Sequence, residues 1–357
     1  MQKYIRRAAL EVLRTTGVFR MVRDSRWRQR RLLILCYHGI AQEDEHEWRP
    51  RLFMHERLLE ARLETLKREQ CNVVGLAEGL EKLQAGELPP RSVAITFDDG
   101  CYDFYAKAYP LLHRYGFPVT VYQTTYYSDF QRPIFNLICS YMLWKRRGSV
   151  LDRGAEIELP PTMDLRTEES RQEIVFSLVQ RSEKQGLTGA QKDELASRLA
   201  KILDIDYEAL ARKRIVQLMT PAEVAELSAA GVDFQLHTHR HRTPKDENLF
   251  RREIVDNRQW LQRVVGKSTA HFCYPAGDYD PQFLPWLRAD GVVSATTCDA
   301  GLATAESESL LLPRFVDTSA RSATEFESWL TGVGELLSFR KEASRHRLQM
   351  AGFPKRA

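Results

Sequence analysis

The sequence lacks any apolar run that approaches the roughly 18 residues needed to cross a bilayer. Its N-terminus is basic but lacks the continuous apolar core and the small-residue cleavage site of a secretory signal. The six cysteines are scattered and include no CxxC pair, so reduced thiols are favoured over a disulfide framework. From these absences we expect a cytoplasmic protein.

Patterns typical of nucleic-acid binding are missing as well. The chain contains no helix-turn-helix, RNP or zinc-finger pattern, so we expect no nucleic-acid partner. Internal repeats and low-complexity segments are also absent. What is present is an ordinary globular composition, with 43% hydrophobic and 28% charged residues in 357. This length allows one large α/β domain with insertions, or two domains.

The positive charge is concentrated at the N-terminus. Residues 1–31 hold ten Lys or Arg and two acids, a net of +8, so the formal net charge of +4 leaves −4 for the remainder. We predict a basic amphipathic N-terminal helix here, with an apolar stripe that includes Ile5, Ala8, Ala9, Val12 and Leu13. One alternative is peripheral contact with an anionic membrane at its inner face. The other is a solvated helix whose stripe packs on the main domain.

Short apolar runs recur along the chain, and most are followed by a helical pattern. The predicted strands cover residues 32–37, 72–76, 92–97, 119–125, 232–238, 270–275, 292–298 and 310–316. The predicted helices cover residues 54–69, 77–85, 103–115, 220–230, 247–265 and 281–290. This alternation predicts a mostly parallel sheet, and about eight strands favour a barrel. Chemistry is then expected at the carboxyl ends of the strands.

Residues 130–219 interrupt this alternation. They are helical and charged, with a polar stretch at 153–164. We interpret them as an insertion that covers the barrel mouth, either as a lid or as a substrate platform. The alternative is a helical decoration without contact to the site.

Two adjacent carboxylates follow a buried strand in "SVAITFDDG", residues 92–100. Gly100 allows a sharp turn, so Asp98 and Asp99 can both reach the barrel mouth. Two close carboxylates are costly unless a proton or a cation neutralises one of them. We therefore predict that one aspartate binds a metal ion while the other stays free as a base. The alternative is a turn with two solvated aspartates.

Histidines crowd the end of another predicted strand in "LHTHRH", residues 236–241. Imidazole is a suitable partner for a carboxylate in a metal site, and His237 and His241 are the candidate ligands. His239 is interpreted as a solvated strand-end histidine, and the alternative is a residue that supports the metal ligands or tethers the chain.

A third strand end carries "HFCYPAGDYD", residues 271–280, in which Tyr274 to Gly277 predict a tight turn. Such a turn presents a backbone N–H to a developing oxyanion, although turns of this kind are mostly structural.

Together, "TFDDG", "HTHRH" and "FCYPAGDYD" resemble, in order, the first three motifs of the polysaccharide deacetylases, the NodB-like carbohydrate esterase family 4. "LCYHGI" at 35–40 and "LPRFV" at 312–316 resemble flanking elements of the branch whose third motif is Phe-x-Tyr-Pro-x-Gly. The similarity covers about 32–125 and 220–330. It implies an α/β fold, a distorted (β/α) barrel over 32–340 that the helical insertion 130–219 interrupts. Residues 341–357 then form a basic tail.

The resemblance also implies a role for individual residues. Asp98 matches the catalytic base, and Asp99, His237 and His241 match the ligands of a divalent metal, usually zinc (Zn2+), with Co2+ or Ni2+ as alternatives. The peptide N–H of Tyr274 matches the group that helps to hold the oxyanion.

Two elements depart from the family pattern. The late histidine that serves many relatives as general acid is missing, because the only histidine after 271 is His346 in the charged tail. His38 is therefore the better candidate acid, with a barrel-floor or supporting histidine as the alternative. The usual arginine motif is also absent, and Arg314 is either the ion-pair partner of Asp98 or a surface arginine.

The predicted function is metal-dependent removal of an N-acetyl group from an amino sugar carried by a polymer, a lipid or a nucleotide. Cytoplasmic placement favours the lipid-linked or nucleotide-linked precursors of a surface polysaccharide. The alternatives are hydrolysis of another non-peptide amide or ester, and a catalytically inactive carbohydrate-binding protein. Glycoside hydrolysis is disfavoured because adjacent aspartates do not give the roughly 5 Å or larger separation that such chemistry uses.

Overall fold

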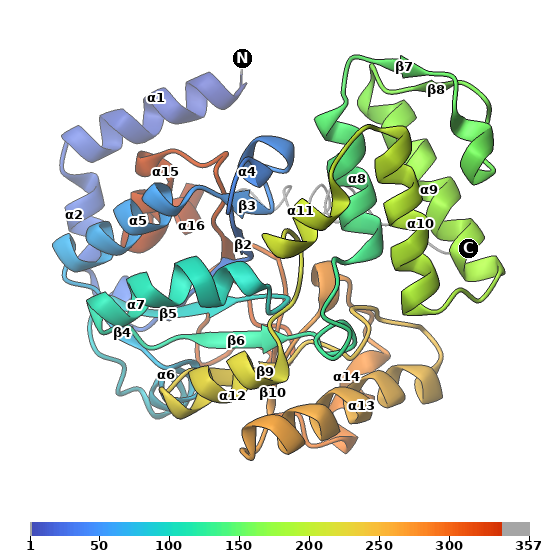
Figure 1. Ribbon diagram of the computed structural model, residues 1–357. Helices are drawn as coiled ribbons and strands as arrows, with labels where there is room; N and C mark the ends of the chain where they lie inside the picture. Colours follow the sequence, from blue (N-terminus) through green and yellow to red (C-terminus); the bar gives the residue numbers. More distant parts are fainter. Residues whose placement is uncertain (1, 338–357) are drawn as a thin grey trace.

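Parallel strands form the central sheet of the computed structural model, which describes residues 2–337 (Figure 1). Its strands are β1 (Leu33–Tyr37), β4 (Asn72–Val74), β5 (Ser92–Phe97), β6 (Thr120–Gln123), β9 (Asp233–Leu236), β10 (His271–Cys273), β11 (Ser294–Thr296) and β12 (Phe315–Val316). Their order is β11-β10-β9-β6-β5-β1-β12, and β4 pairs with β5 beside this path. Each strand lies within one of the eight predicted runs.

The two ends of this sheet meet, so that the sheet curls into a barrel. The N–H of Leu312, just before β12, donates to the carbonyl of Ala295 in β11 at 2.8 Å. In return the N–H of Thr297 donates to the carbonyl of Leu312 at 2.9 Å. The barrel is distorted because one edge of β5 is shared, with β4 along residues 92–94 and β6 along residues 96–97. The predicted distorted (β/α) barrel is confirmed.

The strands are buried on both faces, as expected for a parallel sheet covered by helices. Ile34, Ala94, Tyr122, Cys273 and Leu312 belong to one hydrophobic cluster, which fills the barrel interior. Alternate residues such as Leu35, Ile95 and Val121 pack outward in the larger hydrophobic cluster. The surrounding helices are α5 (Glu56–Arg68), α6 (Leu76–Ala85), η1 (Phe104–Ala108), α7 (Tyr109–Tyr115), α12 (Pro221–Ala229), α13 (Glu247–Val265), α14 (Phe283–Ala289), α15 (Ala323–Thr331) and α16 (Val333–Leu337).

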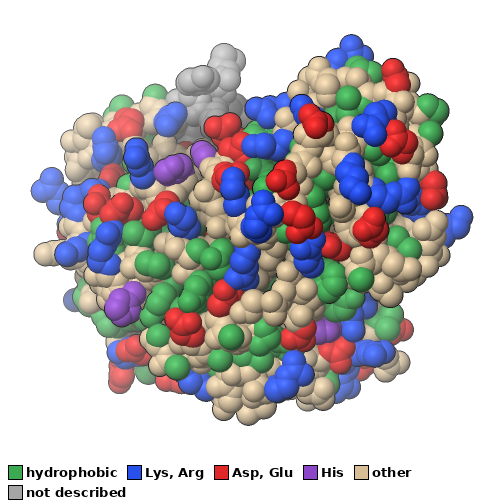
Figure 2. Space-filling view, viewed as in Figure 1, with side chains coloured by type: hydrophobic (Ala, Val, Ile, Leu, Met, Phe, Trp, Pro, Cys, Tyr) green, Lys and Arg blue, Asp and Glu red, His purple; other side chains and the backbone are tan. Residues whose placement is uncertain are grey.

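The insertion folds as a helical unit with its own hydrophobic cluster, seen at the upper right of Figure 1. Its elements are α8 (Phe135–Lys145), β7 (Val150–Leu151), η2 (Gly154–Ile157), β8 (Met163–Asp164), α9 (Glu168–Lys184), α10 (Gly189–Ile202) and α11 (Tyr207–Arg212). Trp48 joins this cluster from α4 (Glu45–Trp48), and Phe53 joins it from β3 (Phe53–Met54), which pairs with β2 (Gly39–Ile40). Figure 2 shows Lys and Arg mixed with Asp and Glu over this unit, rather than a patch of one sign.

The C-terminal end of the insertion contacts the loop that follows β5. The N–H of Met219 donates to the carbonyl of Gly100 at 3.0 Å, and the N–H of Tyr102 donates to the carbonyl of Gln217 at 2.9 Å. The insertion is therefore attached at the carboxyl end of a sheet strand, next to the aspartate pair.

The N-terminal segment forms three helices rather than the single one predicted: α1 (Gln2–Thr15), α2 (Val18–Arg23) and α3 (Arg26–Gln29). Of the predicted stripe only Leu13 packs on the rest of the protein, so the alternative of a stripe packed on the main domain is largely wrong. Leu10 packs with Phe19 and Val333, whereas Ile5 and Val12 are 63% and 58% exposed. The side of α1 that faces α15 carries Leu10, and Ile5 and Val12 lie on the opposite side.

Part of the positive charge at the N-terminus serves the fold. Arg28 is fully buried and donates to the carbonyl oxygens of Leu330, Arg31 and Ser92. Within residues 2–337, no helix combines the length and the apolarity that a membrane crossing requires. The predicted basic tail 341–357, with His346, lies outside the described residues.

Candidate catalytic and metal site

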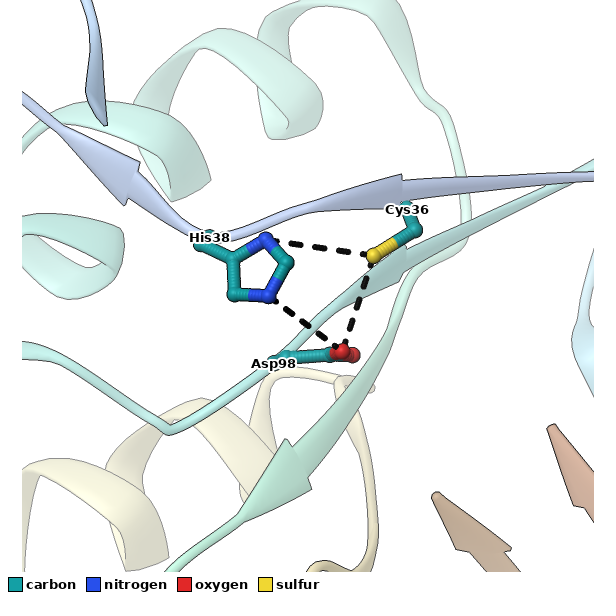
Figure 3. Close-up of side chains that lie close together, drawn as sticks. All are labelled: Cys36, His38 and Asp98. Atoms are coloured by element: carbon teal, nitrogen blue, oxygen red, sulfur yellow. Dashed lines mark hydrogen bonds and ion pairs between the residues drawn. The ribbon is translucent and has the colours of Figure 1, made fainter. Parts of the chain in front are cut away.

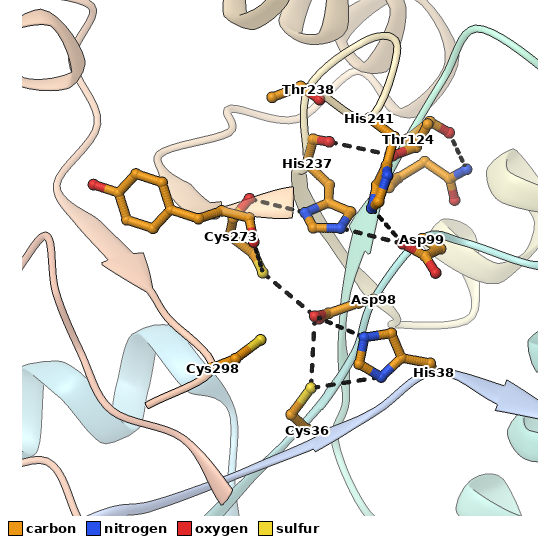
Figure 4. A network of polar contacts seen from close by, with 12 residues as sticks. Cys36, His38, Asp98, Asp99, Thr124, His237, Thr238, His241, Cys273 and Cys298 are labelled. Atoms are coloured by element: carbon orange, nitrogen blue, oxygen red, sulfur yellow. Dashed lines mark hydrogen bonds and ion pairs between the residues drawn. The ribbon is translucent and has the colours of Figure 1, made fainter. Parts of the chain in front are cut away.

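Polar side chains from the ends of four strands of the sheet converge at one end of the barrel (Figure 4). They are His38 after β1, Asp98 and Asp99 after β5, His237 and His241 after β9, and Cys273 at the end of β10. This is the carboxyl end of the parallel sheet, where the sequence places the predicted site.

The turn after β5 brings both aspartates to the same end of the barrel. Asp99 has φ 71° and Gly100 has φ 76°, so two consecutive residues adopt the left-handed conformation. The strand alternation breaks there, as predicted. A side chain at Gly100 would overlap the Gln123 amide. Left-handed backbone at a residue other than glycine costs on the order of 1–3 kcal/mol and is often found at functional sites.

Asp99, His237 and His241 form a three-residue cluster with metal-ligand chemistry. Asp99 Oδ1 lies 3.3 Å from His237 Nε2 and 3.1 Å from His241 Nε2, and one ligand atom from each residue lies within 4.8 Å of the others. Asp99 Oδ1 is buried and receives no hydrogen bond from the described residues. Two imidazole nitrogens and a carboxylate oxygen around an unsatisfied atom fit a divalent ion such as zinc.

The charges in this cluster favour the deprotonated aspartate. Burial opposes ionisation of Asp99, but His241 and His237 outweigh it and hold the pKa of that carboxyl well below its ordinary value. Burial likewise works against protonation of His241, yet the charge of Asp99 raises the pKa of this imidazole. A divalent ion bound here would replace the proton on His241 as the positive charge that faces Asp99.

The orientation of His237 leaves one nitrogen available for a ligand. Its Nδ1 lies 2.8 Å from the carbonyl oxygen of Cys273, a contact that requires Nδ1 to carry the proton. The lone pair is then on Nε2, which faces Asp99. A second hydrogen bond, 2.9 Å from the backbone N–H of His237 to Asn257 Oδ1, fixes the chain at this point. Supporting contacts of this kind orient metal ligands.

Asn257 is a supporting residue that the sequence analysis missed. It is fully buried in α13 and donates through Nδ2 to the carbonyl of Gln123 at 2.9 Å, so it joins the ends of β6 and β9. The signal was present in the sequence, since Asn257 shares the buried face of this helix with Phe250, Ile254 and Leu261. A polar residue in an apolar stripe usually has a specific partner.

The loop that carries His241 is held from α13 as well. Glu253, 1% exposed, accepts from the backbone N–H of Arg240 at 2.8 Å and from Arg242 Nε at 2.6 Å. His239 Nδ1 lies 2.8 Å from Thr125 Oγ1. His239 is therefore a half-buried tether to the end of β6, and its interpretation as a solvated histidine was wrong.

The side chain of Asp98 is more buried than that of Asp99 and is held by an arginine. Arg314 Nη1 and Nη2 donate to its two carboxylate oxygens at 2.7 Å each, and both side chains are buried. Burial opposes the charge of Asp98, but Arg314 outweighs it and holds the pKa of this carboxyl far below its ordinary value. Arg314 is fully buried, which excludes the surface alternative for this residue.

His38 lies beside Asp98 (Figure 3). Its Nε2 is 3.7 Å from Asp98 Oδ2, and its Nδ1 is 3.9 Å from Cys36 Sγ. Burial lowers the pKa of His38 more than the neighbouring aspartates raise it, so the neutral imidazole is favoured.

The structure differs from the expectation for Tyr274. Its peptide N–H donates to the carbonyl of Thr296 at 3.2 Å, because the pairing of β10 with β11 continues one residue beyond β10. Its hydroxyl donates to the carbonyl of Leu310 at 3.1 Å. The predicted oxyanion donor is therefore already engaged within the sheet.

Comparison with known proteins identifies a family model and several structures of the same fold. The model described as polysaccharide deacetylase matches residues 85–160 and 193–295. No curated protein matches the sequence. A Streptococcus pyogenes deacetylase, PplD, is 19% identical with a TM-score of 0.56, and the alignment covers 84% of this chain and 98% of that one.

Two further solved structures are similar. IcaB from Ammonifex degensii is 16% identical with a TM-score of 0.50, over 84% of this chain and 97% of its own. A polysaccharide deacetylase from Bacillus cereus is 15% identical with a TM-score of 0.52, over 84% of this chain and 69% of its own. At these identities the three structures establish the shared fold.

Proposed function

The chain belongs to the polysaccharide deacetylase family and is a hydrolase of the sugar N-deacetylase class, and we propose that it acts on an N-acetylated amino sugar with a divalent cation held by Asp99, His237 and His241. The observation that carries the proposal is the buried Asp99 Oδ1 between two imidazole nitrogens, directly beside the Asp98–Arg314 pair. Zinc is the first candidate cation, and Co2+ or Ni2+ are alternatives.

The bound cation supplies Lewis-acid polarisation of water and of the amide carbonyl. Asp98 accepts the proton of the attacking water as the new C–O bond forms. Arg314 keeps this carboxylate ionised and fixes its orientation through two parallel hydrogen bonds. Because the pKa of Asp98 is held low, the carboxyl does not retain the proton.

His38 is the proposed proton donor to the leaving amine. Its neutral form can accept the proton from Asp98 at Nε2, 3.7 Å away, and Nε2 then protonates the amine as the C–N bond breaks. The products are acetate and a free amino sugar, and both His38 and Asp98 return to their starting states. Tyr274 has no role in this mechanism, because its N–H is engaged with Thr296.

The test is metal content measured together with acetate release. Chelator-stripped protein is refilled with zinc, cobalt or nickel, and bound metal is counted by elemental mass spectrometry. His237→Ala should lose the cation and the activity, whereas His113→Ala, on the exposed face of α7, should keep both. Metal uptake by His237→Ala equal to that of the wild type would contradict the proposed ligand set.

The substrate carrier and the location are part of the same proposal. We propose a cytoplasmic enzyme that acts on a lipid-linked or nucleotide-linked precursor, with residues 130–219 as a lid or substrate platform. All six cysteines are free, which is consistent with a reducing compartment. Acetate release should be compared among nucleotide-linked, lipid-linked and polymeric substrates, with simple amides and esters as controls. Preference for the polymer would overturn this assignment.

We also propose that α1 makes peripheral contact with the membrane, which would bring the enzyme to a lipid-linked substrate. Ile5, Val12 and Met21 are more than half exposed on the basic N-terminal segment, as expected for an interfacial helix. Ile5→Asp combined with Val12→Asp should weaken sedimentation with anionic vesicles, and neutral vesicles provide the control. Equal sedimentation of variant and wild type would exclude this contact.

A further inference from the structure

Cys36, His38 and Asp98 form a second set of groups that could ligate a metal (Figure 3), and in Figure 4 Cys36 and His38 lie on the side of Asp98 away from the proposed triad of Asp99, His237 and His241. Cys36 Sγ lies 3.5 Å from Asp98 Oδ2, and His38 Nε2 lies 3.7 Å from the same oxygen. One ligand atom from each of these three residues lies within 4.8 Å of the others. None of the three belongs to the cluster of Asp99, His237 and His241.

The distances from Asp98 Oδ2 to Cys36 Sγ and to His38 Nε2 suit one small cation, whereas the 3.9 Å contact between Cys36 and His38 is made by the other imidazole nitrogen, Nδ1. Ligands held about 2.0–2.3 Å from a tetrahedral zinc ion lie about 3.3–3.8 Å from one another. A further donor is close, since Cys273 Sγ lies 3.4 Å from Asp98 Oδ2. A thiol, an imidazole and a carboxylate together select soft or borderline cations over calcium or magnesium.

We propose that Cys36, His38 and Asp98 bind a second divalent cation of the thiol-seeking class, Zn2+ or Cd2+, and that its binding inhibits the enzyme. The thiol of Cys36 loses its proton to solvent as the sulfur–metal bond forms. The resulting thiolate and the Asp98 carboxylate offset the charge of the cation. The positive charge of Arg314, which is paired with the same carboxylate, opposes binding of a cation. We therefore expect this second site to bind a cation more weakly than the cluster of Asp99, His237 and His241.

Inhibition is expected because the second site shares ligand atoms with the proposed catalytic residues. This part of the inference rests on the proposed function. The second cation would occupy Asp98 Oδ2 and an imidazole nitrogen of His38, which are the base and the proton donor of the proposed mechanism. The enzyme would then be active with one cation and inactive with two. Excess zinc should therefore inhibit a protein that stoichiometric zinc activates.

The experiment is a cadmium titration of the chelator-stripped full chain. Bound metal is counted by elemental mass spectrometry, and thiolate-to-cadmium charge transfer is followed in the ultraviolet. Asp99, His237 and His241 contain no sulfur, so the absorption comes from a thiolate outside that cluster, and the variants must distinguish Cys36 from Cys273, whose Sγ lies 3.4 Å from Asp98 Oδ2. The wild type should bind about two ions per chain and show the absorption.

Variants separate the two sites. Cys36→Ser should bind about one ion without the absorption, with Cys36→Ala as a second variant and thermal melting as the folding check. Cys71→Ser is the matched control, because Cys71 is half-buried and belongs to none of the metal-ligating groups, and it should behave like the wild type. His241→Ala should lose the other ion and keep the absorption.

Two results would overturn the inference. One is binding of a single cadmium ion by the wild type without the absorption, and the other is an unchanged absorption in Cys36→Ser. A His241→Ala variant that binds as much metal as the wild type would instead count against the proposed catalytic site. The ratio of activity at excess zinc to activity at stoichiometric zinc should rise in Cys36→Ser but not in Cys71→Ser.

Discussion

Arg314 donates to both carboxylate oxygens of Asp98 at 2.7 Å, although 216 residues separate the two in the sequence. The pair spans β5 and the segment before β12, on either side of β1. Its guanidinium also donates through Nε to the carbonyl of Thr297 at 2.9 Å, next to the seam where the sheet closes. One side chain therefore links the carboxylate of Asp98, the proposed base, to the closure of the barrel.

Replacement of Arg314 should damage both stability and activity. Arg314→Met leaves the Asp98 charge buried without a partner, and a loss of about 3–5 kcal/mol in the free energy of unfolding is expected. Urea denaturation measures this loss, and acetate release should fall to background.

The matched control is the other buried Arg–Asp pair, Arg62 with Asp317, whose Nε–Oδ2 distance is 2.9 Å. Arg62→Met should cost a similar free energy while the enzyme that remains folded keeps its activity. Equal activity losses in the two variants would mean that Arg314 acts only through stability.

Gly100→Ala should destabilise the protein more than Gly86→Ala. Both glycines have positive φ, 76° and 73°, so both variants carry backbone strain of about 1–2 kcal/mol. Only at Gly100 would the new methyl group meet the Gln123 amide, whereas Gly86 has open space. Gln123 cannot move freely, because its Nε2 donates to the carbonyl of Thr124 at 2.6 Å. The difference between the two unfolding free energies measures this steric cost, and equal values would refute it.

Asn257→Ala should weaken metal binding although Asn257 is not a ligand. Loss of a supporting hydrogen bond of this kind typically costs about 10–100-fold in metal affinity. An unpaired buried N–H at His237 should also cost about 1–3 kcal/mol of stability. Competition with a chelating dye measures the affinity. Asn72→Ala, at an exposed strand residue, is the control and should leave the affinity unchanged.

His271 should make the protein less stable in mild acid. Burial lowers the pKa of this imidazole below its ordinary value near 6.5, and its Nδ1 lies 2.8 Å from Ser294 Oγ. The unfolded chain then binds a proton that the folded chain does not, so stability falls as the pH drops through about 6.5 toward the folded pKa.

Urea denaturation of the wild type and His271→Gln on both sides of that pH tests this dependence. His271→Gln should remove part of the acid sensitivity, and His113→Gln, on the exposed face of α7, should not. An identical pH dependence in the wild type and His271→Gln would exclude the effect.

The strands and the cluster of Asp99, His237 and His241 proposed as metal ligands could be predicted from the sequence because each leaves a local signal. Strands buried on both faces read as apolar runs, so "SVAITF" and its counterparts mark the sheet. Asp98 and Asp99 follow one such run, and His237 stands near the end of another. The pairing of Thr297 with Leu312 leaves no comparable pattern, because closure depends on residues distant along the chain and on the curl of the sheet.

Other features were missed or mistaken for identifiable reasons. Helical periodicity on α1 groups Ile5 with Val12, but the neighbouring helix contacts the side that carries Leu10, and no sequence pattern fixes that choice. The resemblance to the family implied that the N–H of Tyr274 helps to hold the oxyanion, yet strand pairing extends to that residue. Arg314 remained one of two alternatives, since only burial distinguishes an ion-pair partner from a surface residue.

The position of the insertion has a consequence for the order of folding. β6 and β9 are neighbours in the sheet, but their paired residues Thr120 and Asp233 are 113 apart in the chain. Closing so long a loop is slow when its contents are disordered. If the helical unit folds first from its own local contacts, it shortens the effective loop and brings the two strands together. Substitutions such as Leu199→Ala in that unit should then slow refolding of the barrel, and with it the meeting of Asp99 and His237.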